Sequence, residues 1–236
     1  EFLGIGTQKG GTTTLHQLLT SHPQVFLPKC KEIHFFSLHY EKGANWYTNH
    51  FEDAAINQIK GEITPLYLFD PKAPKRIHKI LPKAKLITLL RDPVERTLSQ
   101  IFHARKRGFE TLEPKDAIDA EKERLRLGSQ FSMQKHSYIA RSRYLEQLER
   151  YEKLFPENNM LIIKSESLFD NTSTAWRKIQ EFLDIDIMPN PVSLPRANRG
   201  RGEALKIDKT LINVLRDELA ETVHGIKSKY NIDWGW

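Results

Sequence analysis

Short apolar runs alternate with longer amphipathic segments along most of the chain. Uninterrupted apolar runs bounded by polar or turn residues are typical of buried strands. Such runs predict strands at residues 2–5, 25–27, 85–90 and 160–163. Apolar residues at helical spacing predict helices at residues 13–20, 74–81, 94–106 and 137–154. Strands that alternate with helices indicate an α/β fold, in which a mostly parallel central sheet is flanked by helices.

The composition is typical of one globular domain. Of the 236 residues, 39% are hydrophobic and 28% are charged, which provides enough apolar material for a core and too much for a disordered chain. No apolar run approaches the roughly 18 residues of a membrane-spanning helix. Because the sequence shows neither a repeat nor an interdomain linker, we expect a single domain over residues 1–236 without a membrane span.

The charge of the chain is mildly basic. The 36 Lys and Arg residues against 30 Asp and Glu residues give a formal net charge of +6. This excess is spread along the sequence, and it suits either nucleic acid or a small, highly anionic ligand held in one pocket. The charge alone therefore does not choose between these two partners.

The cysteine content bears on the compartment. Cys30 is the only cysteine, which excludes an intrachain disulfide and a zinc site with two thiolate ligands. A reducing compartment is favoured, and we expect a cytoplasmic location. The sequence opens at Glu1 without a Met and runs directly into a strand, which suggests that an amino-terminal segment, with any signal or anchor, has been removed.

A glycine- and threonine-rich loop connects the first predicted strand to the first predicted helix. Adjacent glycines let the backbone turn so that successive N–H groups converge, and the amino end of the helix adds partial positive charge. Threonine hydroxyls and a lysine ammonium complete an oxyanion site. The residues assigned to it are Lys9, Gly10, Gly11, Thr12, Thr13 and Thr14. A capped glycine turn would need only one hydroxyl and one glycine, so we favour the anion site.

This loop differs from the two common nucleotide-binding patterns. The nucleotide triphosphatase loop has a lysine directly after its second glycine, whereas here Thr12 stands in that place and Lys9 lies upstream. The dinucleotide fingerprint does not fit the stretch in the right register either. The loop therefore predicts anion binding without metal-assisted triphosphate chemistry, and we expect no metal.

The loop resembles the 5′-phosphosulfate loop of sulfotransferases that use 3′-phosphoadenosine 5′-phosphosulfate (PAPS). Directly after the strand at 85–90, residues 91–99 are similar to the 3′-phosphate segment of that family, in which an arginine and a serine eight residues later hold the phosphate. The resemblance implies these roles for Arg91 and Ser99. Taken alone, the pair Arg91-Asp92 is explained equally well by a local ion pair at the end of a strand.

Two further segments extend the resemblance. The run Lys31-Glu32-Ile33-His34-Phe35-Phe36 resembles a Lys-Glu-x-x-Phe-Phe segment of the heparan sulfate sulfotransferase branch, whose glutamate is the general base. The resemblance implies that Glu32 is the catalytic base and that His34 assists it. By themselves the two would be an exposed carboxylate and a histidine at the edge of the core. Residues 61–67 resemble a Gly-Glu-Lys-[Ser/Thr]-Pro-x-Tyr segment, but Ile63 replaces a lysine that often contacts the reacting end.

A basic loop near the carboxyl end is similar to the mobile loop that closes on the 3′-phosphate in this family. We assign Arg199, Gly200 and Arg201 to it, with the choice between the two arginines open. A solvated basic turn is the alternative. Residues 143–156 resemble a later helix of the family and its Phe-Pro stop, and we interpret Tyr144 as a packing residue.

The resemblance implies a PAPS-dependent sulfotransferase with a P-loop-like sulfotransferase fold. The sulfuryl group of PAPS would move by in-line displacement to a hydroxyl or amine of an acceptor, for which a carbohydrate is favoured. Trp46 and Tyr47 are candidates for stacking on sugar rings or for the core. Relatives resident in the Golgi carry an amino-terminal anchor, so the Golgi lumen is the alternative location.

Two other functions compete with this one. A strand, glycine loop and helix with downstream arginines also fit a P-loop kinase of small molecules, although the position of Lys9 argues against it. A non-enzymatic nucleic-acid binder would use the basic runs at 105–107 and 122–126, which on a helix are more often a solvated face. We therefore expect no nucleic-acid partner.

Overall fold

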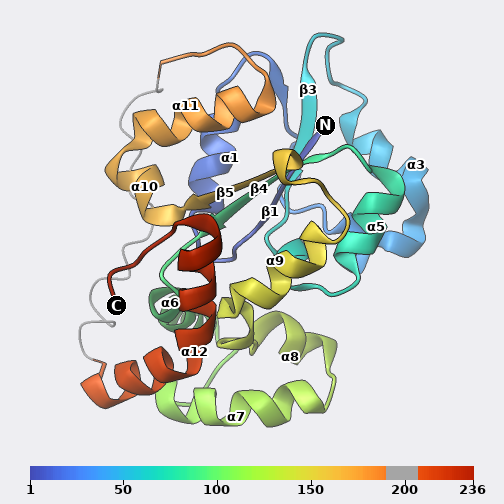
Figure 1. The fold of residues 1–236 in the computed structure, drawn as a ribbon. Coiled ribbons are helices and arrows are strands. Elements are labelled where there is room, and N and C mark those ends of the chain that lie inside the picture. Colours follow the sequence, from blue (N-terminus) through green and yellow to red (C-terminus); the bar gives the residue numbers. More distant parts are fainter. Residues whose placement is uncertain (190–206) are drawn as a thin grey trace. The chain divides into compact units, whose positions relative to one another are not determined.

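The computed structural model of the protein describes residues 1–189 and 207–236 (Figure 1). The chain divides into two compact units. The sheet unit comprises Glu1–Leu90 and Gln147–Ala197, and the helical unit comprises Arg91–Glu146 and Asn198–Trp236. Two compact units can belong to one domain or to two. The expected single domain over residues 1–236 therefore stays a prediction.

The sheet unit is built on a parallel five-stranded sheet with the strand order β2-β3-β1-β4-β5. The strands are β1 (Phe2–Gly6), β2 (Val25–Phe26), β3 (Ile59–Ile63), β4 (Lys85–Leu90) and β5 (Met160–Lys164). In the registers of β1, Phe2 lies opposite Gly61 of β3 and Lys85 of β4. The predicted α/β fold with a mostly parallel sheet is confirmed, whereas β3 was not among the predicted strands.

Helices flank this sheet. In Figure 1, α1, α10 and α11 lie on one side of it and α5 and α9 on the other. The helices are α1 (Thr12–Thr20), α2 (Phe35–Leu38), α3 (Gly43–Thr48), α4 (Leu66–Phe69), α5 (Ala73–Ile80), α9 (Tyr144–Glu152, which enters the unit at Gln147), α10 (Ser165–Asp170) and α11 (Thr172–Leu183). Leu15 and Leu18 of α1 and Trp176 of α11 share one buried cluster with the strands. Burying each such side chain contributes about 1.5–3 kcal/mol.

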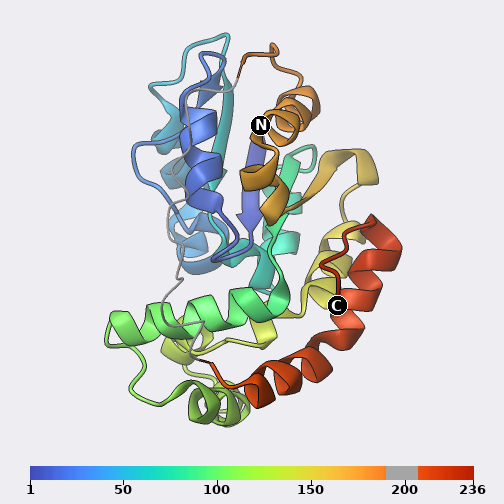
Figure 2. The same cartoon turned by 90° about the vertical axis from the view of Figure 1, so that its left-hand side faces the viewer.

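The helical unit contains α6 (Pro93–Lys106), α7 (Pro114–Arg126), α8 (Gln130–Lys135) and α12 (Lys209–Tyr230). Its core forms where apolar residues of α6, α7 and α12 meet, among them Leu98, Ile118 and Leu219. Figure 2 shows α12, in red, beside α6. In the described parts of the chain, no helix is both long and apolar enough to cross a membrane.

The predicted helix at 137–154 is wrong in its first part. Residues Ala140–Ser142 form a short 3-10 turn, and α9 begins only at Tyr144. The backbone N–H groups of Ile139 and Ala140 donate to the buried carboxylate of Glu121, at 2.7 and 2.9 Å. Because a side chain from α7 satisfies these groups, the backbone here does not need an α-helical ladder.

Candidate functional site

The loop between β1 and α1 packs closely onto the end of β4. The N–H of Thr7 donates to the carbonyl of Leu89 at 2.9 Å, and the N–H of Gly10 donates to the carbonyl of Thr7 at 3.0 Å. A Cβ atom on Gly10 would lie 2.7 Å from the Leu89 oxygen, so only glycine fits there. Gly11 has a left-handed backbone with φ of 94°, which also favours glycine. These constraints explain the adjacent glycines.

Ser165, at the start of α10, holds this loop from a second side. Its hydroxyl donates to the carbonyl of Gly10 at 2.6 Å, and the residue is only 2% exposed. Sequence reasoning missed this residue. The available signal was its position just beyond a predicted strand, because the loops at the carboxyl ends of parallel strands gather at one edge of the sheet.

The three threonines of the loop differ in their exposure. Thr12 and Thr14 are 6% and 1% exposed and lie in the core, whereas Thr13 is exposed. The amino end of α1 is capped by Gly11, which provides no side-chain oxygen. The N–H groups of the first helical turn are therefore suited to an anion, and the anion site stays a prediction. Lys9 is partly buried and has a left-handed backbone with φ of 69°.

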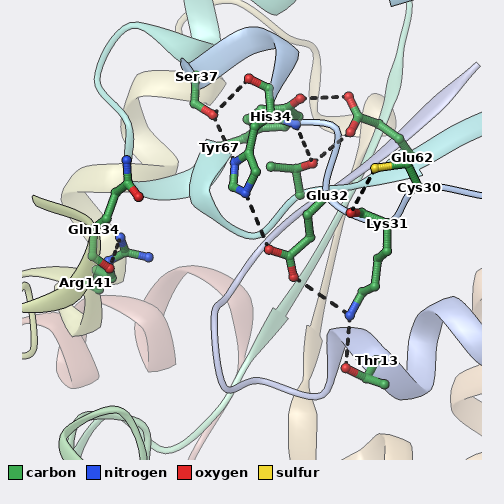
Figure 3. A network of polar contacts seen from close by, with 11 residues as sticks. Thr13, Cys30, Lys31, Glu32, His34, Ser37, Glu62, Tyr67, Gln134 and Arg141 are labelled. Atoms are coloured by element: carbon green, nitrogen blue, oxygen red, sulfur yellow. Dashed lines mark hydrogen bonds and ion pairs between the residues drawn. The ribbon is translucent and has the colours of Figure 1, made fainter. Parts of the chain in front are cut away.

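The segment containing Glu32 lies against this loop. The ammonium group of Lys31 donates to the hydroxyl oxygen of Thr13 at 3.0 Å, and it lies 3.8 Å from the Glu32 carboxylate. The other carboxylate oxygen of Glu32 is 3.6 Å from Nε2 of His34 (Figure 3). Two motifs that are separate in the sequence are thus brought together, and an acidic group stands between a lysine and a histidine.

The backbone of this segment is strained. Glu32 and His34 have left-handed conformations with φ of 61° and 58°. For residues other than glycine this conformation costs about 1–2 kcal/mol each. Such strain persists only where the surroundings fix the backbone, and it is common at functional sites.

A buried hydrogen-bond network around Glu62 fixes the backbone of the segment that contains Glu32 and His34. The Tyr67 and Thr64 hydroxyls each donate to one carboxylate oxygen of Glu62, both at 2.7 Å. Their oxygens in turn accept the backbone N–H groups of Phe36, at 3.3 Å, and of His34, at 3.5 Å. Figure 3 shows Glu62, Tyr67 and His34 of this network. Burial raises the pKa of Glu62, and the hydrogen bonds from the two hydroxyls oppose this rise. Both oxygens of Glu62 have donors, so this carboxylate positions the segment.

The position of Ile63 in the core explains why an apolar residue stands there. It lies in β3, is 1% exposed and belongs to the core. A Cβ on the neighbouring Gly4 would lie 2.9 Å from Ile63, which shows how closely the two strands pack around this side chain. A lysine at this position would place its charge in the core.

The two candidate stacking aromatics have different environments. Tyr47 is 4% exposed and stacks on Phe35 with ring centroids 4.7 Å apart, so it is a core residue. Trp46 is partly exposed, with the ammonium of Lys42 lying 4.5 Å from its ring and the ring of His50 4.7 Å away. Of the two, only Trp46 has a surface for a sugar ring.

Arg91 and Ser99 both belong to the helical unit. The guanidinium of Arg91 pairs with Glu95 at 3.1 Å, while Asp92 caps α6 by accepting the N–H of Glu95 at 3.0 Å. Arg91 therefore forms an ion pair with Glu95, one turn along α6. Glu95 and Ser99 are four residues apart on α6, so they share a face of the helix. Tyr144 is buried and donates its hydroxyl to the carbonyl of Arg91 at 2.9 Å, as a packing residue would.

Arginines of the two basic runs are paired with acidic groups. The pairs are Arg105 with Glu113 at 2.7 Å, Arg124 with Glu110 at 2.5 Å and Arg126 with Glu123 at 2.7 Å. Ion pairing within the helical unit weakens the case for a nucleic-acid surface built on these runs. The predicted residues Arg199, Gly200 and Arg201 lie outside the described residues.

Comparisons with known proteins agree with the motifs. The sulfotransferase domain family matches residues 1–206. The membrane-associated sulfotransferase kil1 of Dictyostelium discoideum is 48% identical over 102 residues, which cover 42% of this chain and 22% of that protein. The heparan sulfate glucosamine 3-O-sulfotransferase 5 of Mus musculus is 28% identical over 186 residues, which cover 77% of this chain and 52% of that protein. The chain therefore spans about half the length of this second relative.

A solved structure has the same fold. The sulfotransferase from Alicyclobacillus acidocaldarius superposes with a TM-score of 0.85 at 24% identity, over 98% of this chain and 96% of that one. The match extends over the sheet and the helices, and it agrees with the predicted fold class.

Proposed function

Because the chain belongs to the sulfotransferase domain family, we propose that it transfers the sulfuryl group of PAPS to a hydroxyl or amine of a carbohydrate acceptor. The family match favours this function over the P-loop kinase. The observation that carries the proposal is the 3.0 Å hydrogen bond between Lys31 and Thr13, because it joins the anion loop to the segment that holds Glu32. Transfer of an anionic group to a hydroxyl requires an anion site next to a base.

The anion loop suits the 5′-phosphosulfate end of PAPS. Gly10 has no room for a side chain, and Gly11 leaves the first-turn N–H groups of α1 without a side-chain cap. Backbone donors and the Lys9 ammonium would hold the phosphate without a metal. Arg91 and Ser99 are proposed to hold the 3′-phosphate.

Glu32 is proposed to act as the general base. Its carboxylate accepts the proton of the acceptor hydroxyl while the acceptor oxygen forms a bond to sulfur. The bond between sulfur and the oxygen of the 5′-phosphate breaks, and the departing phosphate carries that electron pair. Lys9 and the amino end of α1 stabilise the negative charge that grows on this oxygen. His34, 3.6 Å from the carboxylate, holds the orientation of the base.

A glycan acceptor is supported by the segment around Glu32 and by the heparan sulfate relative. The exposed face of Trp46, with Lys42 beside it, offers one aromatic and one cationic contact for an anionic sugar.

The test combines binding with transfer. Calorimetry with adenosine 3′,5′-bisphosphate (PAP), the desulfated donor, is expected to show binding that ATP with magnesium does not compete away. Radiolabelled PAPS is then incubated with heparan sulfate, unsulfated heparosan, a phenol and an aliphatic alcohol, and the label is expected on a glycan. Absence of PAP binding together with binding of ATP and magnesium would sink the proposal. Label on the phenol alone would overturn the glycan acceptor and leave the donor assignment intact.

A further inference from the structure

Lys31 lies between the anion loop and Glu32, the proposed base. Its ammonium is 3.0 Å from the Thr13 hydroxyl on the first turn of α1 and 3.8 Å from the Glu32 carboxylate (Figure 3). The side chain is 29% exposed, so much of its length packs against the protein. Because two groups contact the ammonium and the stem is partly buried, this lysine has a defined position, unlike the lysines of an open surface.

One electrostatic contact of this ammonium is unfavourable. A cation beside the amino end of a helix faces the positive end of the helix dipole, which costs about 0.3–1 kcal/mol. The effect on the neighbouring His16 has the same sign, because burial and then the charge of Lys31 lower the pKa of that imidazole. A hydroxyl at 3.0 Å and a carboxylate at 3.8 Å oppose this repulsion, and an anion bound at the helix end would add a second favourable charge.

We propose that Lys31 is a catalytic residue that contacts the sulfuryl group during its transfer. This inference rests on the proposed function. In an in-line displacement the sulfur lies between the attacking oxygen, next to the base, and the leaving oxygen, next to the anion loop. The Lys31 ammonium lies between the same two groups, since it contacts Glu32 on one side and Thr13 on the other. Its charge therefore meets the oxygens that remain on sulfur throughout the reaction.

PAP and PAPS separate this role from simpler ones. Both nucleotides carry the same two phosphates, but only PAPS carries the sulfuryl group. A residue that contacts that group must contribute more to PAPS affinity than to PAP affinity. A lysine that only binds the 5′-phosphate, or that only orders Thr13 beside it, would contribute to both equally. A lysine that only orders Glu32 would contribute to neither.

The experiment compares variants of the full chain by calorimetry with each nucleotide. Lys31→Met removes the charge and the hydrogen bond, and Lys31→Gln keeps a donor for Thr13 without the charge. We expect both to leave PAP affinity unchanged and to lower PAPS affinity about tenfold or more, as for a hydrogen bond to a charged group. Lys29→Met is the matched control, because Lys29 is exposed and pairs only loosely, at 3.7 Å, with Asp53.

Two results would overturn the role of Lys31. These are an equal loss of affinity for both nucleotides, and wild-type PAPS affinity in Lys31→Gln. If Lys31→Met does not fold, as judged by thermal melting, Lys31→Arg takes its place and is expected to keep the preference for PAPS that Lys31→Gln loses. Failure of the wild-type protein to bind either nucleotide would instead contradict the proposed function.

Discussion

Replacing Gly10 by alanine tests the anion loop most directly. The added Cβ would lie 2.7 Å from both the Leu89 carbonyl oxygen and a methyl carbon of Thr7. An ordinary contact begins at 3.4 Å, so the loop would have to move by about 0.7 Å. The Ser165 hydroxyl holds the Gly10 carbonyl at 2.6 Å, which opposes this movement. Overpacking of this kind costs about 1–3 kcal/mol.

If PAP binds only to the native position of the loop, the cost of holding alanine in that position lowers the affinity for PAP. With a factor of ten for every 1.4 kcal/mol, a cost of about 1–3 kcal/mol corresponds to a loss of about 5- to 150-fold in affinity. We expect calorimetry to show weaker PAP binding in this range for Gly10→Ala. Chemical unfolding is expected to show a loss of stability within the same limits.

Gly108→Ala is the matched control. Gly108 has a left-handed backbone with φ of 71°, but a Cβ there would meet no atom within 4 Å. Alanine at this position costs about 1–2 kcal/mol through backbone strain alone. We expect a comparable loss of stability with unchanged PAP affinity. Wild-type PAP affinity in Gly10→Ala would refute the assignment of the loop as the phosphate site.

Three further predictions concern acidic residues. Glu32→Gln is expected to lower turnover by about 10² to 10⁴-fold with PAP binding retained, and unimpaired transfer of label would remove Glu32 as the base. Glu62→Gln leaves one buried hydroxyl without an acceptor, so urea unfolding should show a loss of about 1–3 kcal/mol in the free energy of unfolding. Turnover should fall while PAP still binds, and unchanged turnover would argue against a positioning role. Burial pushes the pKa of Glu110 upward, but hydrogen bonds from Arg124 and other donors lower it from 4.5 to about 2. Its ionised form therefore adds stability above pH 4.5 that is lost as the pH falls toward 2. The difference in unfolding free energy between wild type and Glu110→Gln should shrink over that pH range, and a constant difference would contradict this.

Much of the sheet was predictable because β1 and β4 are mainly apolar runs that are buried almost throughout, while β2 and β5 are short runs with several apolar residues. The strand β3 was missed because Lys60 and Glu62 interrupt the apolar pattern. Glu62 is tolerated in the core only because the hydroxyls of Thr64 and Tyr67 satisfy it. Such compensation depends on the folded geometry, so no periodicity of the sequence reveals it.

The early start predicted for α9 has a similar cause. Apolar and aromatic spacing continues through residues 137–154, but Glu121 takes the N–H groups of Ile139 and Ala140. The buried Arg96 also holds this stretch. Its guanidinium donates to the carbonyl of Tyr138, and it donates to the hydroxyl of Ser142 at 2.5 Å. Burial lowers the pKa of Arg96 only to about 10, so it stays charged at neutral pH and its donors stay in place. Tertiary hydrogen bonds here override local spacing.

The candidate site shows which part of a function is local in sequence and which is not. Each motif is contiguous, so glycines, threonines and Glu32 could be assigned from chemistry or resemblance. Their assembly follows from the sheet: β1 lies between β3 and β4, so the loop after β1 meets both neighbours at the carboxyl edge. Thr7 bonds to β4, and Ser165 reaches Gly10 from the end of β5.

The contacts proposed to decide the chemistry form where these loops meet at the carboxyl edge of the sheet. Lys31 and Thr13 are 18 residues apart and belong to different motifs, yet their hydrogen bond sets the distance between a proposed base and a proposed anion site. A substitution at Lys31 would leave the strands, the glycines and the base unchanged while altering the charge between the two ends of the reaction. The same fold can therefore keep its phosphate-binding loop while its affinity for PAPS and its rate change through the few side chains that meet at this edge.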